Sequence, residues 1–84
     1  MKSVTVYTTE RCAFCVAAKA LLKKRGIAYD EINLSRDPDS RYELADITGM
    51  ATFPQIVIEG QALGGFEELR DADRSGRLAE LLAA

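Results

Sequence analysis

The chain has no histidine, no tryptophan and only two cysteines among its 84 residues. A structural zinc ion needs four ligands, usually cysteine or histidine, so one copy of this chain cannot build such a site. The absence of histidine also means that no imidazole is present to act as the base for a nucleophilic side chain. A reactive cysteine in this chain must therefore rely on backbone N–H groups, a helix terminus or a nearby cation.

Long apolar runs are also missing, although hydrophobic residues make up 48% of the chain. The apolar stretches are far shorter than the ~20 residues that cross a bilayer, so we expect no membrane segment. No signal-peptide h-region precedes the first cysteine, and we expect a cytoplasmic protein. The formal net charge is −2 and the one basic tract is Lys23-Lys24-Arg25, which does not favour nucleic-acid binding. The length fits a single domain over residues 1–84.

The two cysteines stand three residues apart, in the sequence Cys12-Ala13-Phe14-Cys15. At the start of a helix this spacing places both sulfurs on one face, where they can close a disulfide. Cys12 falls where free backbone N–H groups and the helix dipole favour a thiolate, whereas Cys15 shares the apolar face of the helix. The pattern indicates a redox pair with an accessible attacking thiol and a buried resolving thiol.

Three other interpretations of the cysteine pair stay open at this point. A structural disulfide is one, although a four-residue ring constrains the unfolded chain little. Ligation of a metal or cluster shared between chains is another, and a pair of inert, buried thiols is the third. We favour dithiol redox chemistry because the pair stands at a predicted strand-to-helix junction.

Strand and helix patterns alternate along the chain. Apolar residues at strand spacing predict four strands, the last two forming a hairpin at Gly60. Gly26 ends the first predicted helix, and Asp37-Pro38 supplies an N-cap and a first-turn proline for the second. The last two predicted helices are separated by a break at Ser75-Gly76. The predicted strands cover residues 3–8, 27–34, 55–59 and 61–63, and the predicted helices cover residues 12–25, 37–49, 66–73 and 78–83.

Three motifs together resemble the glutaredoxin family. Residues 12–15 correspond to the family's C-P-Y-C element, Thr52-Phe53-Pro54-Gln55-Ile56 corresponds to T-V-P-Q-I, and residues 64–69, Gly-Gly-Phe-Glu-Glu-Leu, correspond to G-G-x-D-D-L. The motifs occur in the family's order and spacing, and the resemblance covers essentially the whole chain. It implies an α/β protein with a thioredoxin-like fold, a four-stranded mixed sheet flanked by helices in the order β-α-β-α-β-β-α.

The resemblance also implies a glutathione-dependent thiol-disulfide oxidoreductase that reduces protein disulfides and glutathione mixed disulfides. Cys12 and Cys15 are then the catalytic residues, and a cis Phe53-Pro54 bond beside them lets an extended peptide such as glutathione pair with the Phe53 backbone. Glutathione is the expected co-substrate and no resident metal is expected. The expected partners are glutathione and disulfide-bearing or glutathionylated proteins, with the chain as a monomer. The glutathione contacts implied by the resemblance are Arg11, Phe14, Thr52, Phe53, Pro54, Gly65, Phe66 and Glu67.

The paired glycines at residues 64–65 are suited to ligand binding independently of the family resemblance. They place flexible backbone directly before a helix start at Phe66, where N–H groups can receive a carboxylate. The family resemblance implies that the γ-glutamyl carboxylate of glutathione binds these N–H groups and that Glu67 binds its amino group. The alternative is a plain turn, with Glu67 and Glu68 only complementing the helix dipole.

The chain departs from the family pattern at several positions. Ala13 and Phe14 replace the proline and tyrosine of the commonest motif, residues 8–10 include no lysine, and Met50 stands where a basic residue is common. Arg11 is the candidate replacement for the missing positive charge. Loss of the motif proline leaves open a second function, a glutathione-ligated [2Fe-2S] cluster carrier. The aromatic Phe66 leaves open a third, a redoxin reduced by thioredoxin reductase that serves ribonucleotide reductase.

Overall fold

The computed structural model of the chain describes residues 1–83, and Ala84, the last residue of the predicted domain, lies outside them. Strands and helices alternate until the β3–β4 hairpin, which two helices follow. The strands are β1 (Val4–Thr8), β2 (Asp30–Asn33), β3 (Gln55–Ile58) and β4 (Gln61–Gly64). The helices are α1 (Ala13–Lys24), α2 (Pro38–Thr48), α3 (Phe66–Ser75) and α4 (Arg77–Leu82).

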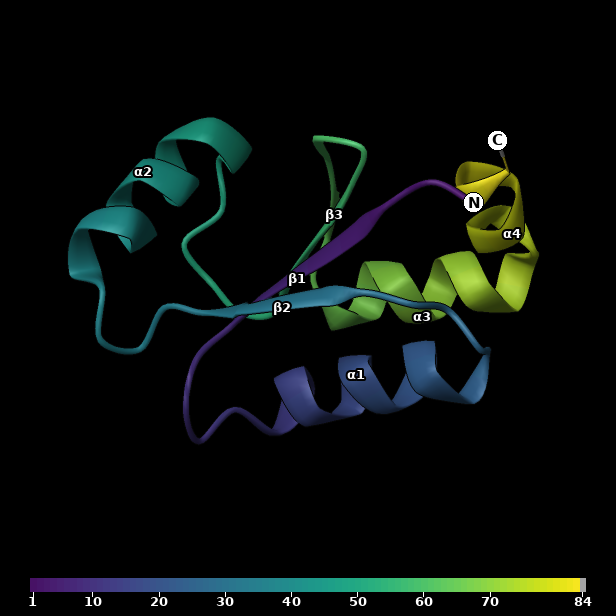
Figure 1. Cartoon of the computed structure of the whole chain (residues 1–84), viewed down its shortest axis with the longest axis horizontal. Coiled ribbons are helices and arrows are strands. Elements are labelled where there is room, and N and C mark those ends of the chain that lie inside the picture. Colours follow the sequence, from purple (N-terminus) through teal and green to yellow (C-terminus); the bar gives the residue numbers. More distant parts are fainter. Residues whose placement is uncertain (84) are drawn as a thin grey trace.

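The four strands form one mixed sheet in the order β2-β1-β3-β4. β1 pairs with β2 in parallel, through a crossover that contains α1, and it pairs with β3 in antiparallel. β3 and β4 form the predicted hairpin. Helices α1 and α3 lie side by side on one face of the sheet, and α2 lies on the other side (Figure 1). The predicted thioredoxin-like architecture is confirmed.

The main hydrophobic core lies between the sheet and helices α1, α3 and α4. Val4 and Val6 point into it from β1, because alternate residues of a strand face the same side. Leu22 of α1 and Leu69 of α3 are fully buried there, and each such side chain contributes about 1.5–3 kcal/mol. The other buried members of this core are Ala18, Ile56, Ile58, Ala72, Leu78 and Leu82.

The predicted start of β2 at residue 27 is wrong, since β2 begins at Asp30. Ile27 and Tyr29 instead pack against the main core from the connection that follows α1. The Ile27 backbone N–H donates to the Leu22 carbonyl oxygen at 2.9 Å. This hydrogen bond belongs to the C-terminal end of α1 and not to the sheet. Their apolar side chains therefore reflect core contact and not strand pairing. No helix within residues 1–83 has both the length and the apolar character to cross a membrane.

Candidate active site

Cys12 and Cys15 form a disulfide at the start of α1, with their Cα atoms 5.2 Å apart. Cys12 is the N-cap of α1, and its Sγ accepts a hydrogen bond from the Cys15 backbone N–H at 3.1 Å. Cys15 is 2% exposed, whereas Cys12 is partly exposed. This confirms the predicted asymmetry between an accessible and a buried sulfur. After reduction, the same N–H group and the helix dipole stabilise negative charge on Cys12.

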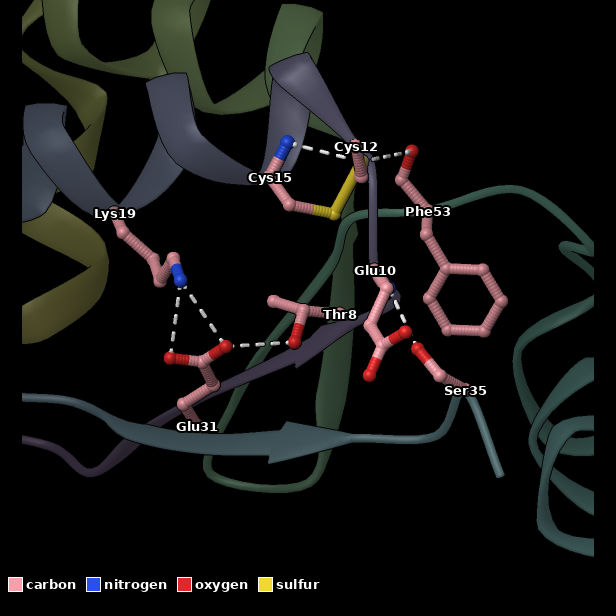
Figure 2. The surroundings of a disulfide bond; sticks show 8 residues. All are labelled: Thr8, Glu10, Cys12, Cys15, Lys19, Glu31, Ser35 and Phe53. Atoms are coloured by element: carbon pink, nitrogen blue, oxygen red, sulfur yellow. Dashed lines mark hydrogen bonds and ion pairs between the residues drawn. A yellow bond between two sulfur atoms is a disulfide. The ribbon is translucent and has the colours of Figure 1, made fainter. Parts of the chain in front are cut away.

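The turn before Cys12 aims the first sulfur outward. Arg11 adopts a φ of 54°, in the left-handed region that residues with a Cβ rarely occupy. Its side chain is exposed beside the helix start. The backbone N–H of Glu10 donates to Ser35 Oγ at 2.6 Å, which fastens this turn to the segment after β2 (Figure 2). The turn therefore holds Cys12 at the surface.

A second loop meets the disulfide at Phe53. The Phe53-Pro54 peptide bond is cis, as the family resemblance implied. The Phe53 carbonyl oxygen lies 3.7 Å from Cys12 Sγ (Figure 2). The buried Gln55 side chain braces this loop through two hydrogen bonds of 2.8 Å. It accepts one from Thr48 Oγ1 and donates the other to the Met50 carbonyl oxygen. Gln55 was predicted as a strand residue and as part of the motif at residues 52–56, but its contacts with Thr48 and Met50 could not be predicted from residue spacing.

A groove of about 330 Å³ runs from this loop to the start of α3. Seven of the eight predicted glutathione contacts line it, and Arg11 does not. The groove places the backbone of Phe53 opposite the first turn of α3, whose N–H groups have no partners within the helix. Its lining residues are Phe14, Thr52, Phe53, Pro54, Gly65, Phe66, Glu67 and Glu68.

Glu68 shapes one end of this groove rather than facing freely into it. Its Oε1 accepts a hydrogen bond from the Gly65 backbone N–H at 2.7 Å. Gly64 has a φ of 135°, and a Cβ placed there would lie 2.6 Å from Glu68 Cγ. Glu67 is exposed at the same end. The structure thus gives the two neighbouring acids different surroundings, which their sequence does not show.

A second groove, of about 580 Å³, lies on the other side of Phe53, between the β1–α1 connection and α2. Arg41 of α2 is the cation among its lining residues, and Tyr42 lies beside it. Sequence reasoning missed Arg41, because α2 offered no motif and its position next to Phe53 is a tertiary contact. The remaining lining residues are Thr9, Glu10, Ser35, Pro38, Ala45 and Ala51.

A polar network ties β1 and β2 to α1, the helix whose start carries the disulfide (Figure 2). Buried Thr8 donates from Oγ1 to Glu31 Oε2 at 2.8 Å, and Lys19 Nζ donates to both Glu31 carboxylate oxygens at 3.1 and 3.2 Å. The hydrogen bond from Thr8, followed by those from Lys19, holds the pKa of Glu31 below its ordinary value. Within the described chain no group of three or more histidine, cysteine, aspartate or glutamate side chains is arranged to hold a metal ion.

Comparison with known proteins gives consistent matches. The glutaredoxin family model matches residues 4–63. A glutaredoxin of Pseudomonas aeruginosa is 40% identical over 84 residues, all of both chains, and glutaredoxin 3 of Escherichia coli (strain K12) is 38% identical over 98% of this chain and 99% of its own. Among solved structures, a buckwheat glutaredoxin-glutathione complex superposes with a TM-score of 0.88 at 27% identity, over 96% of this chain and 76% of that one. The solution structure of a Brucella melitensis glutaredoxin superposes with a TM-score of 0.86 at 39% identity, over 98% and 89%.

The Thr8–Glu31 hydrogen bond predicts a pH-dependent stability. Because the pKa of Glu31 is lower in the folded chain than its ordinary 4.5, this carboxylate stabilises the fold above that pH and the contribution is lost as the pH falls. Thr8→Val should lower the free energy of unfolding by about 1 kcal/mol near neutral pH and by less at about pH 3.5. Thr5→Val, on the same strand, is the control. Equal losses for Thr8→Val at both pH values in thermal unfolding would contradict the assignment.

Gly64 and Gly60 allow a matched test of the groove's end. Both have positive φ, but a Cβ at Gly60 would have nothing within 4 Å. Gly60→Ala should cost about 1 kcal/mol of backbone strain. Gly64→Ala should cost at least about 2–3 kcal/mol, because it adds a clash with Glu68 and disturbs the bond to Gly65. Denaturant unfolding measures both, and equal costs would show that Glu68 moves away freely.

Proposed function

Since the chain belongs to the glutaredoxin family, whose members are thiol-disulfide oxidoreductases, we propose that glutathione is its reductant and that its substrates are protein disulfides and glutathione mixed disulfides. The observation that carries this proposal is the groove beside Cys12. It places the backbone at Phe53 opposite the start of α3, with Cys12 Sγ 3.7 Å from the Phe53 carbonyl oxygen. A tripeptide that lies along such a groove can present its central sulfur to Cys12.

The chemistry is a series of thiol-disulfide exchanges. A glutathione thiolate attacks Cys12 Sγ, the accessible sulfur, and Cys15 leaves as a thiolate that takes up a proton. A second glutathione thiolate attacks the sulfur of the bound glutathione, which forms glutathione disulfide and releases Cys12 as a thiolate. Reduced Cys12 then attacks one sulfur of a substrate disulfide, which breaks the substrate S–S bond and releases the other sulfur as a thiolate. Cys15 resolves the resulting mixed disulfide with a protein, or glutathione resolves the one with glutathione.

The two ends of glutathione find different partners in this proposal. At one end of the groove, the free N–H groups of Phe66 and Glu67 receive the γ-glutamyl carboxylate, and the Glu67 carboxylate receives the amino group. Gly65 contributes shape rather than a donor, because its N–H is bonded to Glu68. A relative solved as a glutathione complex has the same fold, which supports this placement.

The glycine end of glutathione points past Phe53 toward the second groove. Arg41 is the cation that lines this groove, and a guanidinium binds a carboxylate well. Arg41 thus supplies a cation at the glycine end, where Met50 stands in place of the basic residue that is common in the family. A dithiol kept reduced by glutathione suits a reducing compartment such as the cytoplasm. One chain supplies both sides of the groove, which suits a monomer.

A comparison of reductants tests the proposed function. The wild-type chain should reduce the mixed disulfide of glutathione and 2-mercaptoethanol when supplied with glutathione, NADPH and glutathione reductase. Thioredoxin reductase in place of glutathione and its reductase should support little turnover, and faster turnover with it would favour the redoxin alternative. The readout is NADPH oxidation.

Cysteine variants in the same assay separate the two sulfurs. Cys12→Ser should lose activity by about a thousand-fold or more, because a hydroxyl is not ionised at neutral pH. Cys15→Ser should keep activity on this small substrate, since glutathione resolves the intermediate, and should trap mixed disulfides with protein substrates. Equal loss in both variants would remove the route that needs only Cys12.

A charge reversal tests the γ-glutamyl end. Glu67→Lys should raise the KM for the glutathionylated substrate by about 10-fold or more, because repulsion of the substrate amine replaces a charge-assisted hydrogen bond. Glu80→Lys, at an exposed position of α4, carries the same charge change and is the control. Glu68 is unsuitable as a control because its carboxylate caps Gly65. Similar effects at residues 67 and 80 would indicate only a general field, and no effect at Glu67 would place the amine elsewhere.

A further inference from the structure

Two aromatic rings and a guanidinium form a row that begins beside the disulfide. Phe14, two residues after Cys12, is 61% exposed, and its ring is stacked on that of Phe66 with centroids 5.9 Å apart and planes at 27°. The guanidinium carbon of Arg70, one turn further along α3, lies 5.9 Å from the Phe66 ring centre. Phe14 and Phe66 also line the glutathione groove, but Arg70 does not. The row therefore leads out of that groove along α3.

The guanidinium of Arg70 is held in place but has few partners. Its Nε has no exposed surface and, in the described part of the chain, no hydrogen-bond partner. The nearest acid is Asp71, whose Oδ1 is 3.6 Å from Nε, which is too long for a hydrogen bond. The side chain is 38% exposed, and a guanidinium carries five N–H donors. Packing on Phe66 thus holds the guanidinium in place, with donors left for a carboxylate.

The surface around this row is apolar and lacks negative charge on the α1 side. Helix α1 contains no aspartate or glutamate, and Val16 is 63% exposed on it. Arg11 is exposed beside Cys12. On the α3 side Glu67 is exposed next to Phe66, Glu68 is bonded to Gly65, and the exposed carboxylate of Asp71 lies next to Arg70. A partner that presents apolar side chains to the two rings and an acid to Arg70 fits this row, whereas a basic side chain at that end meets the Arg70 guanidinium.

We propose that the Phe14–Phe66–Arg70 row docks the polypeptide of a disulfide-bearing protein substrate, and that Arg70 binds an acidic side chain of that substrate. The two steps of 5.9 Å from the Phe14 ring to the Arg70 guanidinium correspond to roughly four residues of extended chain. Because the row begins at Phe14 beside Cys12, the acid should stand roughly four residues or more from the reacting cysteine. The inference concerns the protein substrate of the proposed function, and it depends on disulfide exchange rather than on glutathione.

A single-turnover reaction without glutathione tests the row. The reduced chain is mixed with the disulfide-linked dimer of a nine-residue peptide whose central residue is cysteine, with glutamate at both ends or lysine at both ends. Cys12 attacks one peptide sulfur and releases the other peptide as a thiolate. Cys15 then loses its proton to solvent and displaces the bound peptide, so that two electrons pass from the dithiol to the peptide disulfide. Samples of the reaction are quenched with acid at timed intervals, and the amount of released peptide thiol is measured in each. The time course gives the second-order rate constant.

The proposal is tested by the ratio of the rate constant for the acidic peptide to that for the basic peptide. The wild-type chain should react at least about 5-fold faster with the acidic peptide at low salt, and salt should reduce the ratio. Arg70→Ala should bring the ratio close to one, and Arg70→Glu should invert it. Arg77→Glu, on α4, is the control and should keep the wild-type ratio. The proposal is overturned if Arg70→Glu keeps the wild-type ratio or if Arg77→Glu shifts it as much. A failure of glutathione as reductant would leave this result unchanged.

Discussion

The start of helix α1 at Cys12 is the constraint on which the rest of the site depends. There the Cys15 N–H donates to Cys12 Sγ at 3.1 Å, and the Phe53 carbonyl oxygen lies 3.7 Å from the same sulfur. One sulfur is thus the cap of a helix, the partner of a disulfide and the neighbour of the Phe53 backbone. A helix needs a cap in any case, and here the cap also belongs to the redox-active cysteine pair. The Cys15 sulfur then falls on the buried face one turn further on.

Three sets of side-chain contacts fix the positions of the chain segments around this helix start. Gln55 braces the loop that carries Phe53, and Glu68 closes the turn before α3. The Thr8–Glu31–Lys19 network ties the end of β1 to β2 and α1. None of these side chains needs to touch the reacting sulfur. Their effect is to fix three separate chain segments, so that under the proposed function glutathione would meet preformed backbone groups and lose less entropy on binding.

The sequence was sufficient for the parts of the site that are local. Cys12 and Cys15 could be assigned to an exposed and a buried position because the helical repeat alone determines their faces. The cis bond at Pro54 came from family resemblance, since a lone proline would not have implied it. β2 was placed too early, because Ile27 and Tyr29 are apolar for the sake of the core. Arg41 was not identified because it lines a groove with Phe53, which is distant along the chain. The contacts of Glu68 with Gly65 and of Arg70 with Phe66 join residues three and four positions apart, but they depend on side-chain conformations that no pattern in the sequence specifies.

The central claim is that the two grooves on either side of Phe53 hold glutathione while its sulfur is joined to Cys12. A crystal structure of the Cys15→Ser variant carrying glutathione as a mixed disulfide on Cys12 tests it most directly. The account predicts the γ-glutamyl carboxylate within hydrogen-bond distance of the Phe66 and Glu67 N–H groups, and the glycine carboxylate beside Arg41. A glutathione that is joined to Cys12 but has its γ-glutamyl end away from α3 would contradict the account.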